Sequence, residues 1–278
     1  RLKNNFNAET LSDRGTLKSN ITSDKILIGD SLVFLNYQFF AKGIDDLILF
    51  ETSFDNQDSL LNYANIDGML VLGSFSKFNL NLTNSDLSID GLHWKLNENN
   101  SIDIDSTSIA VENFQLQNAA QMINIEGQIT ENPKDKILLL VDNVKLETFN
   151  KFNKGSGLSL FGSVNGNAVF SDPYDEFIFS ADLNFKELII NGDSLATGNI
   201  NARWIAEDQV IKTSGNFGEE FSFIGNYNPK SKIENLDVIL TMNNLGLKKF
   251  EPFVKGILSD SKGDLSGSLK IKGTLAEP

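Results

Sequence analysis

Apolar and polar residues alternate along most of this chain. In residues 177–185 every second position holds Phe, Ala or Leu, and residues 78–125 contain several shorter runs of the same kind. Alternation with a period of two places the apolar side chains on one face of a β-strand and the polar side chains on the other. We therefore predict an all-β protein whose sheet has one apolar face and one polar face.

Short polar pairs that contain glycine interrupt the alternation. Such pairs tolerate a positive φ and often form hairpin turns, so hairpins or sheet edges are expected to end at Asp67-Gly68, Asp90-Gly91, Asn191-Gly192-Asp193 and Gly263-Asp264. Helical patterns are few. Apolar residues at three- and four-residue spacing predict a short helix over 247–258, and the corresponding segment 146–152 has room for a helical turn.

Segments of similar sequence recur about a hundred residues apart. The pairs lie at offsets of 105, 101 and 96 residues: 162–173 with 267–278, 137–149 with 238–250, and 132–134 with 228–230. A changing offset indicates that a few residues are inserted in loops between equivalent elements. Repeats of this length are typical of elongated proteins in which each unit buries its apolar face against its neighbours.

The repeat divides the chain into three segments. Residues 1–70 are predicted to form a less regular part of the sheet, residues 71–173 a first repeat unit, and residues 174–278 a second repeat unit that includes the short helix. The predicted fold is an elongated, curled, groove-like β-sheet built from repeats of about a hundred residues, with one or two short helices at the repeat boundaries.

Composition excludes several classes of function. The 278 residues carry a formal charge of −13, and no cluster of Lys and Arg offers the counterion release on which nucleic-acid binding depends. Cysteine is absent, which excludes disulfides and thiolate sites. The longest apolar run within a predicted strand, Ile137 to Val141, is far shorter than the roughly 20 residues of a membrane-spanning helix. No signal peptide begins at Arg1, and we expect the chain to be a fragment of a longer protein.

What covers the apolar face decides the function. A second sheet would give an ordinary closed sandwich. However, the chain contains 21 Phe against 4 Tyr and 2 Trp, and phenylalanine offers bulk without a polar group, which suits contact with hydrocarbon better than with sugars. We therefore predict a groove for lipid acyl chains, and the alternative for each lining residue is packing in a closed core. The predicted lining residues are Leu80, Leu82, Leu87, Ile89, Ile102, Ile104, Ile109, Val111, Phe177, Phe179, Leu183, Phe185, Leu188, Ile190, Leu236, Val238, Leu240, Leu269 and Ile271.

Three stretches carry a family signature: residues 244–253, residues 263–278 with their Gly-Thr-Leu-Ala-Glu-Pro ending, and residues 94–114. On these residues the chain, from residue 70 to the end, resembles the TamB family, the translocation and assembly module within the wider AsmA-like superfamily. This resemblance implies a periplasmic β-sheet, attached to the inner membrane by an N-terminal anchor outside this chain. Such a sheet would carry phospholipids between the membranes. It would also support outer-membrane protein assembly and secretion beside a BamA-like or TamA-like barrel.

Residues that could carry other chemistry are few. His93, the single histidine, has no serine-nucleophile motif nearby, and Asp103 and Asp105 flank Ile104 on the water face of a strand without the spacing of an EF-hand. No catalytic residue, metal, cofactor or enzymatic activity is expected. Two alternatives remain: a scaffold whose sheet edges template the strands of outer-membrane barrels by β-augmentation, and a surface adhesin with a β-solenoid.

Overall fold

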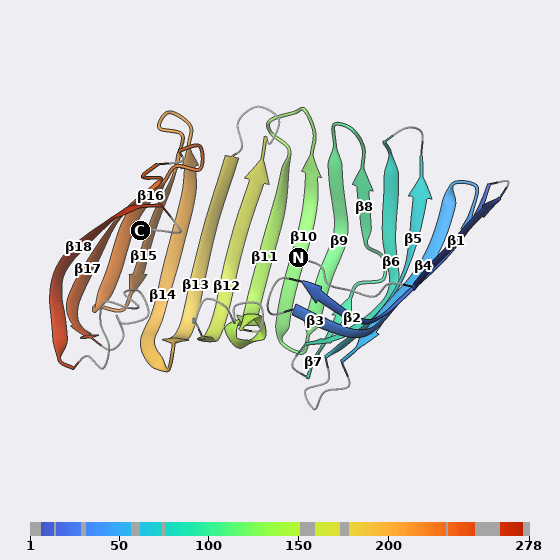
Figure 1. Cartoon of the computed structure of the whole chain (residues 1–278). Helices are drawn as coiled ribbons and strands as arrows, with labels where there is room; N and C mark the ends of the chain where they lie inside the picture. The colour runs from blue at the N-terminus through green and yellow to red at the C-terminus, as the bar shows by residue number, and fades with distance from the viewer. Residues whose placement is uncertain are drawn as a thin grey trace. The chain divides into compact units, whose positions relative to one another are not determined.

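The computed structural model describes residues 7–13, 15–28, 32–56, 62–73, 76–89, 91–150, 159–172, 178–231, 233–247 and 262–274 (Figure 1). The elements in this part of the chain are β-strands except for one short 3-10 helix, and the 18 strands belong to one antiparallel sheet. The all-β prediction is confirmed, and no second sheet occurs among the described residues. The chain forms two compact units, residues 1–139 and 140–278, which are described separately.

Ten strands lie wholly within the first unit. They are β1 (Asn7–Asp13), β2 (Thr16–Ile28), β3 (Leu32–Ile44), β4 (Leu47–Asp55), β5 (Tyr63–Leu72), β6 (Phe78–Ile89), β7 (Leu92–Leu96), β8 (Ser101–Ile104), β9 (Ile109–Asn118) and β10 (Gln121–Ile129). Most strands pair with their neighbours in the sequence. β7 and β8 share one place in the sheet, because both pair with β6 on one side and with β9 on the other. The pairing of β1 with β2 and of β2 with β3 places the opening stretch in the same sheet.

An asparagine side chain bridges the gap between β7 and β8. The Asn100 amide accepts a hydrogen bond from the Leu82 N–H at 2.9 Å and donates one to the Leu82 carbonyl at 2.7 Å, as a neighbouring strand would. It also donates to the carbonyl of Asn97. Since Asn100 is only 2% exposed, these bonds satisfy backbone groups that water does not reach.

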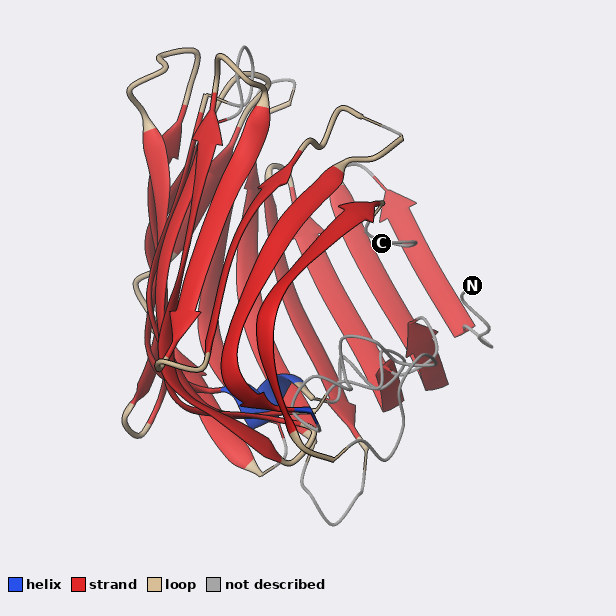
Figure 2. Cartoon of the chain, turned by 90° about the vertical axis from the view of Figure 1, so that its left-hand side faces the viewer, coloured by secondary structure: helices blue, strands red, loops and turns tan. Residues whose placement is uncertain are grey.

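Seven strands lie wholly within the second unit, and β11 enters it at Leu140. The elements are β11 (Lys136–Lys145), the 3-10 helix η1 (Leu146–Phe149), β12 (Leu160–Ser171), β13 (Ile178–Ile190), β14 (Asp193–Ile205), β15 (Val210–Phe217), β16 (Phe221–Tyr227), β17 (Leu236–Gly246) and β18 (Asp264–Gly273). From β12 to β18 each strand pairs with the next in an antiparallel meander. The helix η1, blue in Figure 2, confirms the helical turn predicted within 146–152. The helix predicted over 247–258 lies outside the described residues except for Leu247.

At several β-bulges, one residue with positive φ is inserted into a strand, so that apolar residues an odd number of positions apart still point to the same face. Phe185 and Leu188 are three residues apart, which would put them on opposite faces of a regular strand. Glu187, with a φ of 52°, lies between them where the register of β13 with β14 shifts. Such a β-bulge adds one residue and restores the alternation. Asn113 in β9 and Asn244 in β17 have φ of 51° and 56° at similar register shifts.

The β11–β12 and β17–β18 segments share this bulge geometry. Asn143 and Asn244 have φ of 50° and 56°, and their N–H groups donate to the side chains of Asn165 at 2.9 Å and Ser266 at 2.8 Å. In both segments the acceptor lies 22 residues after the donor. The members of each pair are 101 residues apart, which is the offset that the sequence gives for 137–149 with 238–250.

Backbone conformation favours a different offset from the 105 residues predicted for the following segment. Gly162 and Gly263 have φ of 111° and 101°, and Gly166 and Gly267 have φ of 147° and 144°. In backbone conformation Gly162 thus resembles Gly263, 101 residues away, more closely than Gly267. Both segments contain two glycines four residues apart, and the predicted offset of 105 aligned the first glycine of one segment with the second of the other; the repeat itself stays a prediction.

Asp67-Gly68 lies inside β5, so the turn predicted there is wrong. A Cβ atom on Gly68 would lie 2.2 Å from Cζ of Phe50, its partner on β4. Glycine is required at this position because the phenyl ring of Phe50 covers its backbone. The turn prediction failed because glycine is used both in turns and where another group approaches the backbone closely. The turn expected at Asn191 and Gly192 is confirmed, since these residues join β13 to β14 with φ of 51° and 89°.

Candidate functional site: two apolar sheet faces

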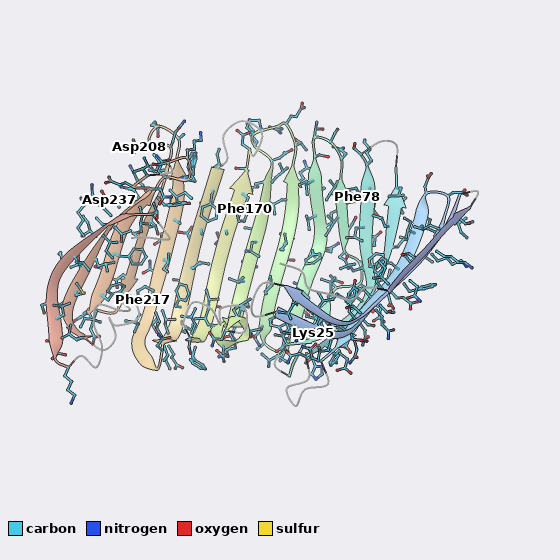
Figure 3. All side chains as sticks on the ribbon, in the orientation of Figure 1. Lys25, Phe78, Phe170, Asp208, Phe217 and Asp237 are labelled. Atoms are coloured by element: carbon cyan, nitrogen blue, oxygen red, sulfur yellow. The ribbon has the colours of Figure 1, made fainter. Side chains whose placement is uncertain are left out.

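Cross-strand partners form rows across the apolar face of the second unit. Residues that pair across antiparallel strands point to the same face, so each row can be followed from strand to strand. One row consists of Gly166, Leu183, Ile200, Gly215, Phe223, Leu240 and Leu269. The next row consists of Val164, Phe185, Gly198, Phe217, Phe221, Met242 and Gly267. Both rows extend over all seven strands of the meander, and every member is apolar. Phe217 of the second row is labelled in Figure 3.

Phenylalanine rings on this face lie over glycines of the neighbouring strand. A Cβ on Gly198 would lie 2.2 Å from Cδ1 of Phe217, and a Cβ on Gly215 would lie 2.3 Å from Cε1 of Phe223. Each glycine is the cross-strand partner of the ring that covers it. The ring centroids of Phe217 and Phe221 are 6.1 Å apart. The rings therefore cover the polar backbone of adjacent strands, which keeps the face apolar where side chains are missing.

A third row on the same face consists of small residues. Its members on β12 to β16 are Ala168, Ala181, Ala202, Thr213 and Gly225. The row that contains Leu183 and Phe223 lies on one side of it. On the other side lie the pairs Phe170–Phe179 on β12 and β13 and Trp204–Ile211 on β14 and β15. Like-facing rows are about 6.8 Å apart along the strands, so the two bulky rows stand about 14 Å apart. We call the set between them the small-residue row.

The first unit also has an apolar face with rows that cross many strands. One row runs from β2 to β10 through Leu17, Gly43, Ile48, Leu70, Leu80, Ile102, Val111 and Gly127. A second row consists of Leu72, Phe78, Ile104, Ile109 and Ile129. A third includes Phe54, Ala64, Leu87 and Trp94. The odd spacing between Leu82 and Leu87 is absorbed by a register shift in the pairing of β5 with β6, so both residues belong to this face.

Strand register brings the predicted lining residues together on these two faces. Phe177 lies outside the described residues, and each of the others is on the apolar face of its own unit. Leu269 is 36% exposed. Four are buried: Val111, Leu188, Ile190 and Leu240. The remaining predicted residues are half-buried. Their contact with lipid stays a prediction.

The sequence interpretation missed several large side chains on the same faces. They are Phe50, Trp94, Trp204, Phe217, Phe221 and Phe223. For most of them, the residue two positions away on the same strand, which points to the same face, is Gly, Ala or Thr. The alternation of bulky and polar residues is therefore incomplete in these strands. A usable signal was available, because a glycine on one strand is matched by an aromatic residue on the next.

The polar face of the second unit carries ion pairs between strands. Arg203 lies 3.1 Å from Asp182, and Lys270 and Lys272 lie 3.5 and 3.3 Å from Asp237. Asp237 is labelled in Figure 3. Burial alone would raise the pKa of Asp237, but the hydrogen bonds and charges of Lys272 and Lys270 together lower it. All these side chains are at least one-third exposed, so the pairs contribute little to the free energy of unfolding.

A cavity of about 610 Å³ lies on this polar face. Its lining includes Arg203, Lys212 and Lys270, together with Ile224, which is 60% exposed. Each of these three cations already faces a carboxylate, as Lys212 does with Asp208 at 2.8 Å. We therefore assign no anionic ligand to the cavity.

His93 belongs to a polar cluster on the first unit. The Tyr63 hydroxyl lies 3.0 Å from Nδ1 of His93 and 3.2 Å from a carboxylate oxygen of Asp86. Burial, followed by the hydrogen bond to Asp86, raises the pKa of Tyr63. The phenol stands between the imidazole and the carboxylate, so this order of groups does not match a carboxylate that orients a histidine base.

Within the part of the chain that the structure describes, no helix is long and apolar enough to cross a bilayer. Nor do its His, Asp and Glu side chains gather in groups of three that could hold a metal ion. Comparison with protein-family models, curated proteins and solved structures finds no match to this chain. The two apolar faces are therefore the features of this chain that bear on its function.

Proposed function

We propose that this protein shields the acyl chains of phospholipids on the apolar faces of its sheet while the lipids pass between two membranes. The observation that carries the proposal is the absence, among the described residues, of a second sheet over rows of Leu, Ile and Phe. Leu72, Phe78 and Leu269 on these faces are 38%, 37% and 36% exposed. Extended apolar surface of this kind is typical of a binding site, and hydrocarbon matches its chemistry.

The free energy of lipid transfer explains the use of such a face. Exposure of hydrocarbon to water costs about 0.8 kcal/mol per CH₂, so a two-chain phospholipid with roughly 30 methylenes meets a barrier of about 25 kcal/mol. A protein face of Leu, Ile and Phe replaces the hydrocarbon of the bilayer and removes most of that barrier. Rows that continue from strand to strand favour movement over tight binding at one point.

The resemblance to the TamB family supports the finer parts of the proposal. In this proposal the chain is a periplasmic segment of an envelope-spanning protein, held at the inner membrane by an N-terminal anchor. Its repeats of about a hundred residues continue the groove, and it supports outer-membrane protein assembly beside a BamA-like or TamA-like barrel. The shared geometry around Asn143 and Asn244 supports the repeat.

The small-residue row supplies a path for a single acyl chain in the second unit. It has bulky rows on both sides and crosses the strands, so a chain that follows it moves along the sheet from one strand to the next. Ala202→Leu fills this path without adding polarity. We expect it to reduce the number of bound phospholipids while the protein stays folded, because Ala202 is only half-buried.

Tryptophan fluorescence provides a direct test of acyl-chain contact. Trp204 and Trp94 are the only tryptophans in the chain, and both lie on the apolar faces through their partners Ile211 and Leu87. Phospholipids brominated on the acyl chain should quench the half-buried Trp204 more strongly than Trp94, which is only 3% exposed, whereas lipids brominated on the headgroup should quench neither. Native mass spectrometry of the purified protein should show bound phospholipid.

Charge variants on opposite faces of the same strand provide the matched control. Phe179→Asp places a carboxylate on the apolar face, where contact with hydrocarbon costs several kcal/mol, so bound lipid should fall at least about tenfold. Ser180→Asp adds the same charge on the polar face, opposite Arg203, and should leave bound lipid unchanged. Equal loss in both variants, or acyl bromine that quenches neither tryptophan, would contradict the proposal.

A second candidate function rests on the edge of the sheet. Among the described residues β18 pairs on one side only, with β17, so its other backbone edge is available to template a strand of another protein. Proline substitutions in β18 should impair that activity and spare lipid binding, whereas Phe179→Asp should do the reverse. An assembly assay for outer-membrane barrels, run beside the lipid assay, separates the two functions.

A further inference from the structure

The polar face of the first unit carries an apolar patch that the alternating pattern does not predict. Its members are exposed, and they lie on β3, β4 and β5 on the face opposite the predicted lipid-binding residues: Phe40 (46%), Ile44 (54%), Leu47 (39%), Leu49 (51%) and Val71 (36%). Ile44 pairs with Leu47, and Leu47 pairs with Val71, so the register joins them into one group. We call this group the outer patch.

Polar residues border the outer patch on both neighbouring strands. On β2, Asn20 is the partner of Phe40, and on β6, Asn79 is the partner of Val71. The patch is thus an apolar island on a face that is otherwise hydrated. An exposed apolar group with a polar rim is typical of a protein–protein contact surface.

Two pairs of like charges lie beside the outer patch. Lys18 and Lys42 are cross-strand partners on β2 and β3, and Glu51 and Asp67 are cross-strand partners on β4 and β5. Like charges directly opposite each other destabilise a sheet, and none of the four forms an ion pair with another described residue. A partner that brings acids to the lysines and bases to the carboxylates would relieve both repulsions.

We propose that the outer patch is the contact surface of a homodimer in which two copies of this chain meet face to face. Phe40, Leu49 and Val71 lie on a diagonal across β3, β4 and β5, and a two-fold axis along this diagonal brings the patches together. A second copy fits better than a bilayer, because an anionic membrane would attract the lysine pair but repel the adjacent acidic pair. This inference does not depend on the proposed lipid function.

The two-fold rotation makes the charges self-complementary. On an ideal ladder, strands are about 4.8 Å apart and like-facing residues about 6.8 Å apart along a strand. In projection, Lys42 then falls within about 3 Å of Glu51 in the second copy, and Lys18 falls within about 3 Å of Asp67. In the same projection, Leu47 falls within about 5 Å of Val71 in the second copy. One operation therefore satisfies both charge pairs and buries apolar side chains on both sides, as an isologous interface requires.

The size of the outer patch sets the expected affinity. It spans roughly 14 Å across its three strands and 14 Å along them, or about 200 Å² in projection for each copy. Stable dimers usually bury about 800 Å² per partner. We therefore expect reversible dimers with a dissociation constant on the order of 10–100 μM, which form only in concentrated solution.

Sedimentation velocity over a range of protein concentrations tests the homodimer. The wild-type mass should rise from 30.8 kDa toward twice that value as concentration increases. Leu49→Asp should hold the protein at monomer mass. Thr83→Asp, at an exposed position of β6 outside the outer patch, serves as the control and should dimerise normally. Circular dichroism confirms that each variant is folded.

Charge reversal separates a homodimer from other associations. The double variant Lys18→Glu/Lys42→Glu has an acidic patch, and Glu51→Lys/Asp67→Lys has a basic patch, so each alone should stay monomeric. An equimolar mixture of the two should associate at least about tenfold more tightly than the wild type at low salt, because every contact is then between opposite charges. A wild type that remains monomeric throughout, dimers that survive Leu49→Asp, or a mixture that does not associate would overturn the proposal.

Discussion

Replacement of Asn100 tests whether a side-chain amide takes the place of a strand in the first unit. The amide bonds to both backbone groups of Leu82 and to the carbonyl of Asn97, at a site that is 2% exposed. Asn100→Ala removes all three bonds. Asn99 is its exposed neighbour, so Asn99→Ala is a control with the same chemical change and no buried partner.

The expected loss of stability follows from the groups left unpaired. One N–H and two carbonyls lose their partner, and an unsatisfied buried polar group costs about 1–3 kcal/mol. We take the lower value for each, since alanine leaves room for water, and obtain about 3 kcal/mol. With a urea dependence of about 2 kcal/mol/M, the unfolding midpoint should fall by about 1.5 M. Asn99→Ala should change the free energy of unfolding by less than about 0.5 kcal/mol.

Asn100→Asp distinguishes lost hydrogen bonds from lost packing. The carboxylate is nearly the same size and still accepts from the Leu82 N–H, but it faces the carbonyls of Leu82 and Asn97 without a proton to donate. At pH 7 this variant should be at least as unstable as Asn100→Ala. At low pH the protonated carboxyl can donate one hydrogen bond to a carbonyl, so part of the lost free energy of unfolding should return. Urea unfolding followed by circular dichroism measures these changes. If Asn100→Ala matches Asn99→Ala, or Asn100→Asp matches the wild type, the bridging role is refuted.

Two further predictions concern local geometry. Gly198→Ala puts a Cβ 2.2 Å from the ring of Phe217 and should cost about 1–3 kcal/mol in urea unfolding, whereas Gly246→Ala meets no atom within 4 Å and should be neutral; equal effects would show that the ring can move freely. The Asp105 pKa is lowered, chiefly by the Thr107 N–H. Its stabilising effect should therefore be complete above the ordinary carboxyl pKa of 3.8 and be lost as pH falls through the lower folded value. Carboxyl-carbon NMR should show this late titration, and Asp105→Asn should weaken the loss of stability in that acid range.

The fold class and the apolar faces could be predicted because their signal is local. Phe179, Leu183 and Phe185 alternate with polar residues in one strand, and alternation alone decides which face each side chain occupies. The prediction worked strand by strand and needed no knowledge of which strands are neighbours. Apolar character also identified the face beyond a bulge. Phe185 and Leu188 are an odd number of residues apart, yet both lie on the apolar face because the bulge at Glu187 adds one residue between them.

Features that depend on the neighbouring strand could not be predicted in the same way. Gly68 has the composition of a turn, and only its partner Phe50 shows that a ring occupies the missing side chain's space. The outer patch also depends on the neighbouring strand. Phe40 and Leu49 are single apolar residues at polar-face positions of their own strands, and they form a group only because β3 and β4 pair. Cross-strand register, rather than periodicity, carries this information.

The meander of the second unit has a consequence for how the chain acquires its structure. From β12 to β18 every strand pairs with the one before it, so no strand waits for a partner that is synthesised much later. Contacts of this kind have short sequence separation and are formed quickly for a β protein. A polypeptide that emerges from a ribosome or a membrane pore with its N-terminus first can therefore add strands one after another to a growing edge, and exposes only one unfinished edge at a time.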